Sequence, residues 1–436
     1  MKETILAVDM GSSNITSVIA TNNNKQVDII NISSTQSLGI KKGTIVDIED
    51  LFLALKNSVE TVKKDNSIEI NKTVVSLCGK DSLNIKSSGK INIPDRLVTN
   101  REINQLLQIC MYNASIPYDY EMIQLIPKLF IIDGVQTVNP LSQAGNNLEV
   151  YVNIIVVKKN LLANVKNMFQ RLDIFNVNFV LKSYSSLFSL TNLKQRMRGI
   201  AVLDLGSQTS EIIAIKGATF LFNDFIAIGS QNITNDLVMM LNISSSDAEN
   251  IKLQYSNLLT NYNELDNKDC TLKVESNIDS INLSNIQTIV HARVEELLVI
   301  LKNKLKNSGC ISDLEEGIII TGGLSKLKGI KELANKIFEG IPIVIQNPIE
   351  DKNSFNDLDE SIISSSIGSI NYIVNFDDRI ELDSNKSLLI NRSIQNNNNQ
   401  QQEKPKPPKE EMILTPLQPK GVSKLKDLYK RFVEIF

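Results

Sequence analysis

Two short segments of this chain share a pattern of residue types that can bind phosphate. In each segment an apolar run ends at an aspartate and then turns through a glycine and a serine. The matching residues are Asp9 with Asp204, Gly11 with Gly206, and Ser12 with Ser207. A second apolar run follows each turn, at 15–20 and at 212–215, which predicts two β-hairpins. The backbone N–H groups at such a tip can bind an anion, and the aspartate beside it can hold a hydrated cation.

The two predicted hairpins also bear on the architecture. If they face each other, they can bind the polyphosphate of a nucleotide from both sides. Strand and helix patterns alternate along the chain, which favours an α/β fold over a helical bundle or a β-sandwich. The second half repeats the plan of the first with a different insert. We therefore expect two duplicated lobes.

Composition limits the classes of protein that this chain can be. With 436 residues, of which 42% are hydrophobic, it can bury a large core and is long enough for two to four structural units. Its formal net charge is −3, so it lacks the basic field typical of nucleic-acid binding. The start of the chain has no signal-peptide pattern, and no apolar run approaches the roughly 18 residues of a membrane-spanning helix. We expect a cytoplasmic protein unless a tether attaches it to a membrane.

The cysteines and the single histidine exclude several kinds of site. The four cysteines, at 78, 110, 270 and 310, include no CxxC pair, which favours a reducing compartment over a disulfide framework or a zinc knuckle. His291 is the only histidine, so multi-histidine metal sites are excluded and Ser-His-Asp chemistry would have to use this residue. It lies in a predicted helix, where a packing or surface role is the expected one.

Regular elements are predicted to position these residues. Strands are expected at 27–35, 44–46, 73–77, 176–181, 271–274 and 317–321, and helices at 50–63, 161–172, 229–241, 286–305 and 325–338. The expected capping pairs are Ser246 with Glu249, for a helix that runs to Tyr255, and Ser284 with Gln287, for the helix at 286–305. Gly309 is expected to end that long helix.

The segment from 84 to 158 has a different pattern and is predicted to be a separate α+β insert. Thr99 and Glu102 form a capping box ahead of a predicted helix at 101–112. Two long strands are expected to follow, at 122–132 and 148–157, with the turn residues Asp133-Gly134 and Asn139-Pro140 between them.

A third glycine motif follows the predicted strand at 317–321. Gly322-Gly323 lies between this strand and a predicted helix, an arrangement that lets backbone approach a flat or phosphorylated ligand closely. Such a pair also occurs in ordinary strand-to-helix turns. Its place in order after the two hairpins favours a nucleotide site.

The order of these motifs resembles the actin-like, ribonuclease H-like fold shared by actin, DnaK-type chaperones, MreB and sugar kinases. Longer segments resemble, more specifically, the FtsA family of bacterial cell-division proteins. These segments are 39–49, 125–134 with Asn139-Pro140 and 148–150, 229–237, and 248–252. The resemblance covers nearly the whole chain.

The resemblance implies a site for ATP and Mg²⁺ built from all of these motifs. The implied nucleotide-binding residues are Gly11, Ser12, Ser13, Asn14, Gly206, Ser207, Gln208, Thr209, Glu249, Lys252, Gly322 and Gly323. Of these, Glu249 and Lys252 would lie near the ribose and adenine. Asp9 and Asp204 would face magnesium through water. No catalytic residue can be singled out.

Four positions depart from the family pattern. Ser207 and Gln208 stand where the family has glycines, Glu211 where it has an aspartate, and Asn14 where many members have a lysine. A glycine at 208 would allow a positive φ and a close approach to the terminal phosphates, whereas glutamine adds a long side chain. Because hydrolysis depends on accurate phosphate geometry and a positioned water, we expect ATP binding with slow or absent hydrolysis.

The resemblance also implies a domain organisation. Lobe I comprises 1–83 and 159–195, with 84–158 inserted as subdomain 1C. Lobe II comprises 196–236 and 302–380, with 237–301 inserted as subdomain IIB. A linker at 381–420 and a helix at 421–436 follow the two lobes. Members of the family self-associate into filaments and bind the tubulin-like protein FtsZ through IIB. Contacts with later division proteins are expected at the insert.

The composition changes near the C-terminus. Residues 391–419 are rich in Asn, Gln, Lys and Pro and cannot bury enough apolar surface to fold, which predicts a disordered linker. On a helical wheel, the residues from 421 to 436 separate into an apolar and a charged face. The expected membrane-binding residues are Val422, Leu425, Leu428, Tyr429, Phe432, Val433 and Phe436, with the basic Lys424, Lys430 and Arg431. This pattern favours an anionic membrane surface over docking on the chain's own fold.

One function and two alternatives follow. The expected function is that of an ATP-binding, self-associating protein that tethers the FtsZ ring to the cytoplasmic face of the bacterial inner membrane at the division site and recruits later division proteins. One short helix binds lipid only marginally, so attachment would need several copies on one scaffold. A small-metabolite kinase of the same superfamily is an alternative, although a kinase has no use for a basic amphipathic tail. The second alternative is a pilus-assembly protein of the PilM type. A test of binding to FtsZ distinguishes this alternative from the expected function.

Overall fold

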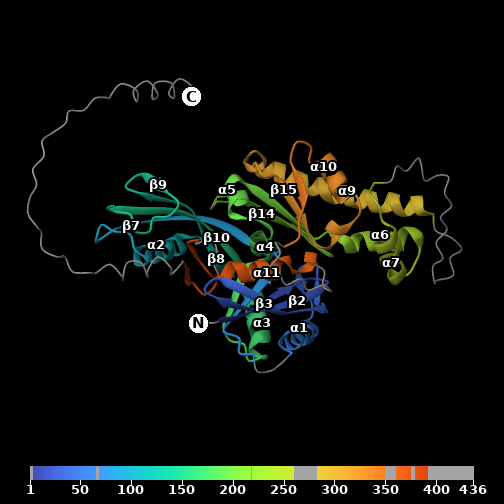
Figure 1. Cartoon of the computed structure of the whole chain (residues 1–436), viewed down its shortest axis with the longest axis horizontal. Helices are drawn as coiled ribbons and strands as arrows, with labels where there is room; N and C mark the ends of the chain where they lie inside the picture. Colours follow the sequence, from blue (N-terminus) through green and yellow to red (C-terminus); the bar gives the residue numbers. More distant parts are fainter. Residues whose placement is uncertain are drawn as a thin grey trace, which may run out of the picture. The chain divides into compact units, whose positions relative to one another are not determined.

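The structure is a computed structural model, and it describes residues 3–64, 68–217, 219–259, 282–348, 360–374 and 379–390. Two five-stranded sheets carry the two hairpins. Helices α4 (Lys182–Leu190) and α11 (Glu360–Val374) pack on each other next to these sheets; α4 contacts strands of both, and α11 contacts the first (Figure 1). A third sheet, of six strands, is formed mainly by the predicted insert.

The two five-stranded sheets have the same topology. The first contains β1 (Glu3–Met10), β2 (Asn14–Asn23), β3 (Gln26–Gln36), β6 (Lys72–Leu77) and β11 (Val177–Leu181), in the order β11-β6-β1-β2-β3. The second contains β12 (Ile200–Leu205), β13 (Ser210–Lys216), β14 (Thr219–Ile226), β15 (Ile318–Thr321) and β16 (Ile343–Ile345), in the order β16-β15-β12-β13-β14. Strand β1 pairs antiparallel with β2 and parallel with β6, just as β12 pairs with β13 and β15. The predicted α/β fold with two duplicated lobes is confirmed.

Amphipathic helices cover the first sheet. Helix α1 (Ile48–Lys63) packs on β2 and β3 and buries the apolar face that its sequence predicts, with Leu51, Leu55, Val59 and Val62. Its N-terminus is capped by the Asp47 carboxylate, which satisfies backbone N–H groups that lack a partner in the helix. Helix α3 (Lys159–Gln170) adds its apolar residues to the same core.

The second lobe has its own hydrophobic core. Its helices are α6 (Ser230–Leu241), α7 (Ser245–Tyr255), the long α9 (Leu283–Ser308) and α10 (Ile330–Ile337). Helices α6, α7 and α9 pack on one another. Gly309 ends α9 with a φ of 75°, as predicted, because glycine adopts this left-handed conformation without steric cost. The short α5 (Leu193–Arg198) precedes β12.

The predicted insert forms a third sheet with one covering helix and a separate core. Its strands are β7 (Leu83–Asn92), β8 (Tyr120–Ile132), β9 (Val135–Thr137) and β10 (Asn147–Lys158), joined at one edge by β17 (Glu381–Leu382) and β18 (Leu388–Leu389). Helix α2 (Asn100–Asn113) packs on β7 and β10. The predicted capping box of Thr99 with Glu102 is present at its start.

Two predicted helix starts were wrong by two residues. Helix α7 is capped by Ser244, whose Oγ accepts a hydrogen bond from the backbone N–H of Asp247 at 3.0 Å, whereas Ser246 lies inside the first turn. Helix α9 is capped by Asn282 rather than by Ser284. In both places a second capping residue lies just upstream, and the local sequence pattern does not distinguish between the two.

The predicted boundaries near the C-terminal part of the fold also differ from the structure. Residues 381–389, which were assigned to the linker, contain the strands β17 and β18. Helix α11, which was assigned to lobe II, packs on α4 and on β1, β2 and β6 of the first sheet. The predicted helix at 325–338 is a 3₁₀ turn, Gly323–Lys326, followed by α10. The strand predicted at 271–274 and residues 391–436 lie outside the described residues.

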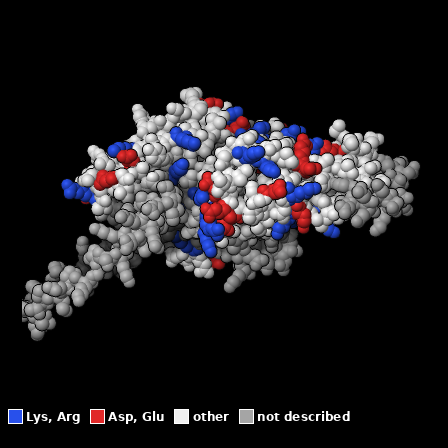
Figure 2. Space-filling model, turned by 90° about the horizontal axis from the view of Figure 1, so that it is seen from above, with Lys and Arg blue, Asp and Glu red and all other residues white. Residues whose placement is uncertain are grey.

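The described surface agrees with the composition. On the face drawn in Figure 2, basic and acidic side chains are intermixed. This face therefore offers no continuous basic surface for a nucleic-acid backbone. Within the described ranges, none of the helices combines the length and the apolar character that crossing a bilayer requires.

Candidate functional site

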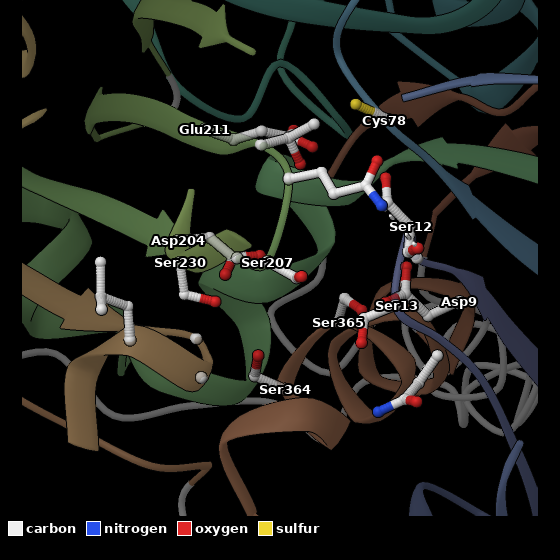
Figure 3. Close-up of a pocket in the computed structure, with 18 of the residues that line it drawn as sticks. Asp9, Ser12, Ser13, Cys78, Asp204, Ser207, Glu211, Ser230, Ser364 and Ser365 are labelled. Atoms are coloured by element: carbon white, nitrogen blue, oxygen red, sulfur yellow. Dashed lines mark hydrogen bonds between the residues drawn. The ribbon is translucent and has the colours of Figure 1, made fainter. Parts of the chain in front are cut away.

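The tips of the two hairpins line one cavity of about 360 Å³, within the usual size range of small-molecule sites. The structure brings all of the predicted site residues to it: Asp9, Gly11, Ser12, Ser13, Asn14, Asp204, Gly206, Ser207, Gln208, Thr209, Glu249, Lys252, Gly322 and Gly323. In Figure 3, Ser12 and Ser13 of the first tip lie across the cavity from Ser207 of the second. Residues far apart in the sequence therefore converge as the hairpin pattern predicts.

Close backbone contacts explain the glycine at each hairpin tip. A Cβ atom on Gly11 would lie 2.6 Å from the Asn14 carbonyl oxygen, and one on Gly206 would lie 2.7 Å from that of Thr209. The Gly206 N–H donates to the Thr209 carbonyl at 3.0 Å, which closes the second tip. Glycine is required because each turn folds back tightly on itself.

The two glycines after β15 have different structural roles. Gly322 has a φ of 87°, and a Cβ atom there would lie 2.4 Å from Asp204 Oδ1. Among the described residues other than its chain neighbours, none lies within 4 Å of a Cβ atom built on Gly323, although this residue lines the cavity. Gly322 therefore serves the packing against Asp204, whereas the absence of a side chain at Gly323 leaves space in the cavity.

Lys182, the first residue of α4, connects the aspartates of the two hairpins. Its ammonium lies 3.2 Å from Asp9 Oδ2 and 3.5 Å from Asp204 Oδ2. The other oxygen of Asp9 accepts a hydrogen bond from the Ser76 hydroxyl at 2.6 Å. Both aspartates are buried, at 3% and 7% exposure, so a cation is needed to balance their charges.

The electrostatics of this cluster keep Lys182 charged. Burial alone would lower the pKa of Lys182, but the carboxylates of Asp9, Asp204 and Glu211 outweigh it and raise that pKa well above its ordinary value. Glu211 behaves differently. Burial is the main cause that raises the pKa of Glu211 to about 7; Lys182 lowers it, whereas Asp204 and Asp9 raise it further. Near neutral pH, Glu211 is therefore divided between its protonated and ionised forms.

The surroundings of Asp9 and Asp204 do not fit the magnesium ion predicted from the sequence. Mg²⁺ requires octahedral oxygen ligands at about 2.0–2.1 Å or ordered waters in their place. The Lys182 ammonium already interacts with one oxygen of each aspartate and would repel a second cation. Within the described ranges, no group of three or more His, Cys, Asp or Glu side chains is arranged to hold a metal ion.

The Gln208 side chain joins the two hairpin tips. Its Oε1 accepts a hydrogen bond from the backbone N–H of Lys42 at 2.8 Å, and its Nε2 lies 3.5 Å from the Ser12 carbonyl oxygen. Lys42 is the turn residue between β4 (Ile40–Lys41) and β5 (Thr44–Ile45). Gln208 does not have a positive φ. The turn therefore accommodates glutamine without backbone strain, and the effect of this residue lies in its side chain.

Glu249 and Lys252 form a preorganised polar group on α7 at the other end of the cavity. Lys252 Nζ lies 2.7 Å from Glu249 Oε2 and donates to the Thr234 hydroxyl at 2.9 Å. The Thr234 hydroxyl in turn contacts Glu249 Oε2 at 2.6 Å. Lys252 is 8% exposed, so these contacts hold its ammonium in place.

Sequence reasoning missed several residues of the cavity wall. Lys182 has no motif around it that signals a site, and neither do Ser364 and Ser365 of α11, which lie between the hairpin tips in Figure 3. The Ser365 hydroxyl is buried and has no hydrogen-bond partner among the described residues. Such an orphaned group at a cavity wall fits a site that receives a polar ligand.

Family models match two long segments of the chain. The model described as "Cell division protein FtsA" matches residues 201–368, and the model described as "SHS2 domain inserted in FTSA" matches residues 79–156. The chain belongs to the FtsA family. The second match coincides with the sheet and helix of the insert, and the first covers the second hairpin and the glycine pair.

Curated FtsA proteins of several bacteria are similar over most of the chain. The FtsA of Helicobacter pylori strain 26695 is 27% identical over 78% of this chain and 75% of its own length. The FtsA of Pseudomonas aeruginosa is 26% identical, over 77% and 81% of the two chains. The FtsA of Bacillus subtilis is 24% identical over 77% of each. FtsA-family similarity therefore extends across both lobes.

Solved structures confirm that this FtsA-family chain has an actin-like fold. A PilM-PilN type IV pilus biogenesis complex matches with a TM-score of 0.57 and 15% identity, over 85% of this chain and 97% of that chain. MreB5 of Spiroplasma citri bound to ADP matches with a TM-score of 0.51 and 12% identity, over 85% and 96%. At these identities the likeness concerns the fold alone.

Proposed function

We propose that this FtsA-family protein binds ATP in the cavity between its hairpins. In cell division it would self-associate and attach the FtsZ ring to the membrane. The observation that carries the nucleotide part is the convergence of both hairpin tips, the Gly322-Gly323 turn and the Glu249–Lys252 pair on one cavity. The tips would bind the phosphates, and the polar group on α7 would contact the ribose and adenine. MreB5 of Spiroplasma citri, which shares the fold, binds ADP and AMPPNP.

Turnover is expected to be slow or absent. Efficient phosphoryl transfer needs an accurately placed terminal phosphate and a positioned water. Here the Gln208 side chain crosses between the tips and bonds to Lys42, in the space that a glycine would leave open. This contact supports binding without efficient hydrolysis. Phosphate release at the rate of an active actin-like ATPase would contradict it.

Gly323→Val tests the nucleotide site with little risk to the fold. Apart from its chain neighbours, no described residue lies within 4 Å of a new Cβ atom at this position, so the variant should keep the thermal stability of the wild type. Its side chain would occupy the cavity and weaken binding of fluorescently labelled ATP by about tenfold or more. Absence of detectable ATP binding by the wild type in any buffer would refute the proposal.

Attachment to a membrane is proposed from the sequence of residues 421–436 and from family membership. A basic amphipathic helix would bind anionic lipid weakly, and self-association would multiply this affinity. A chain that ends before Gly421 should lose co-sedimentation with vesicles that contain phosphatidylglycerol. A full-length variant with Leu428→Glu and Phe432→Glu should behave like the truncated chain. Equal sedimentation of all three proteins would argue against the tether.

Binding to FtsZ is proposed for the segment 237–301. In its described part, Met239 and Met240 of α6 are 81% and 72% exposed, and exposed apolar side chains favour a contact with another protein. Met239→Ser with Met240→Ser should reduce retention of FtsZ by the immobilised protein. Tyr112→Ser, at an exposed apolar position of the insert, is the control. Failure of the wild type to retain FtsZ would favour the PilM-like alternative.

A further inference from the structure

Lys182 is placed where it can contact both lobes and the ligand cavity. It starts α4, which touches the first and the second sheet. Its Nζ lies 3.2 Å from Asp9 Oδ2 in one hairpin and 3.5 Å from Asp204 Oδ2 in the other. About 20% of its side chain is exposed, and it lines the cavity. The Lys182 side chain therefore pairs with both aspartates and also forms part of the cavity wall.

The charges around Lys182 need a cation. Asp9 and Asp204 are buried, and their only ion pair in the described structure is with Lys182. Glu211 adds a third carboxyl group to the same cluster. A phosphate chain brought to the hairpin tips would add further negative charge, and repulsion from the aspartates would oppose its binding. The positive charge of Lys182 reduces the electrostatic repulsion between the aspartates and the phosphate chain of any nucleotide.

We propose that the Lys182 ammonium takes the place of the divalent cation, so that the cavity binds a nucleoside triphosphate without magnesium. This inference rests on the proposed nucleotide site and adds the identity of its counterion. The ammonium offsets one of the two negative charges of the hairpin aspartates and would donate hydrogen bonds to oxygens of the phosphate chain.

An ammonium and a metal ion differ in what they can do. A lysine is a point charge that can donate up to three hydrogen bonds to phosphate oxygens. It has no coordination site at which a water could be activated. A site built around Lys182 therefore favours holding the nucleotide over hydrolysing it. This agrees with the slow turnover expected from the Gln208 contact, although the two arguments rest on different residues.

Equilibrium binding of labelled ATP in excess EDTA and in excess MgCl₂ tests the proposal. The wild type should bind in both buffers with affinities that agree within about twofold. Lys182→Gln should bind at least about tenfold more weakly in EDTA, and magnesium should restore part of the loss, because the freed aspartates can then hold the metal. Lys56→Gln, on the exposed face of α1, is the matched control and should match the wild type.

The outcomes separate this inference from the proposed function. Wild-type binding that requires magnesium would overturn the role of Lys182 but keep the nucleotide site. Absence of binding in either buffer would overturn both. Equal binding by Lys182→Gln and the wild type in EDTA would also overturn the role of Lys182.

A double variant tests the proposal even if Lys182→Gln alone does not fold. Lys182→Gln leaves two buried carboxylates without their cation, whereas Lys182→Gln with Asp204→Asn removes one charge of each sign. The double variant should also lose magnesium-independent binding. In the absence of nucleotide, paramagnetic Mn²⁺ should not bind at the cluster of the wild type. The Lys182→Gln variant, which lacks the ammonium, is the comparison for this measurement. If the wild type bound Mn²⁺ as tightly as Lys182→Gln does, the metal would be displacing Lys182, and the proposal would be contradicted.

Discussion

Gln208 and Lys42 are joined across the two lobes by a hydrogen bond of 2.8 Å from the Lys42 backbone N–H to the Gln208 side-chain oxygen. The first belongs to the hairpin tip of lobe II, and the second to the turn between β4 and β5 of lobe I. A single side chain therefore links the tip of the second hairpin to lobe I.

Gln208→Gly should change the response of the site to the terminal phosphate. The substitution removes the contact with Lys42 and leaves space between the tips, so the affinity for ATP should rise relative to that for ADP by several-fold. Competition of both nucleotides against labelled ATP measures this ratio. Gln208→Glu keeps the size of the side chain but adds a negative charge beside the phosphates, and it should lower the affinity for both nucleotides. An unchanged ratio in Gln208→Gly would show that Gln208 does not limit the phosphate site.

Glu211 should make stability depend on pH near neutrality. Its pKa is raised in the folded protein from 4.5 to about 7, mainly by burial, so the folded state holds the proton more tightly than the unfolded state. The stabilisation from this group is complete below about pH 4.5 and is lost as the pH rises through about 7, with a total of up to roughly 3 kcal/mol. Urea unfolding at a series of pH values measures the effect.

Glu211→Gln provides the control for that pH dependence. The amide is a close match in size and stays neutral at every pH, so the loss of stability between about pH 4.5 and 7 should be smaller in the variant. Lys182, Asp204, Asp9 and Cys78 surround Glu211 and are unchanged in it. An identical pH profile in the two proteins would assign the dependence to another group.

Substitution by alanine should lower stability at Gly322 but not at the neighbouring Gly323. Gly322→Ala forces a Cβ atom to 2.4 Å from Asp204 Oδ1 at a φ of 87°, and the strain should lower the free energy of unfolding by at least about 2 kcal/mol. Gly323→Ala meets open space and should leave stability nearly unchanged. Thermal unfolding of the two variants side by side is the measurement. Equal losses would contradict the distinction between a packing glycine and a cavity glycine.

Lys252→Met should weaken nucleotide binding more than it weakens the fold. The methionine keeps most of the apolar stem, but the ammonium that joins Glu249 and Thr234 is lost. We expect a decrease of about tenfold in ATP affinity with a small change in melting temperature, since Glu249 is partly exposed to solvent. Thr234→Val removes only the hydroxyl between them and should have a smaller effect. A large loss of stability with unchanged affinity would assign the group a structural role.

Local sequence rules predicted the elements that depend on neighbouring residues. The hairpins follow from apolar runs on both sides of a glycine turn, the buried face of α1 from its helical period, and the start of α2 from the Thr99–Glu102 capping box. They failed where two local solutions compete. Both Ser244 and Ser246 have an acidic residue three positions later, and only the contacts of Glu249 with Thr234 and Lys252 show that Glu249 is engaged elsewhere.

By itself, the sequence determined the duplicated α/β plan, the family, and the hairpin, glycine and α7 residues that gather around the cavity, because strand, turn and glycine patterns are encoded within short segments. Only the tertiary structure decided the counterion of the two hairpin aspartates. Lys182 lies in a helix with no site motif, and its ammonium reaches Asp9 and Asp204 because α4 packs between strands of both sheets. The position of a charge in three dimensions depends on long-range packing, which residue spacing along the chain does not specify.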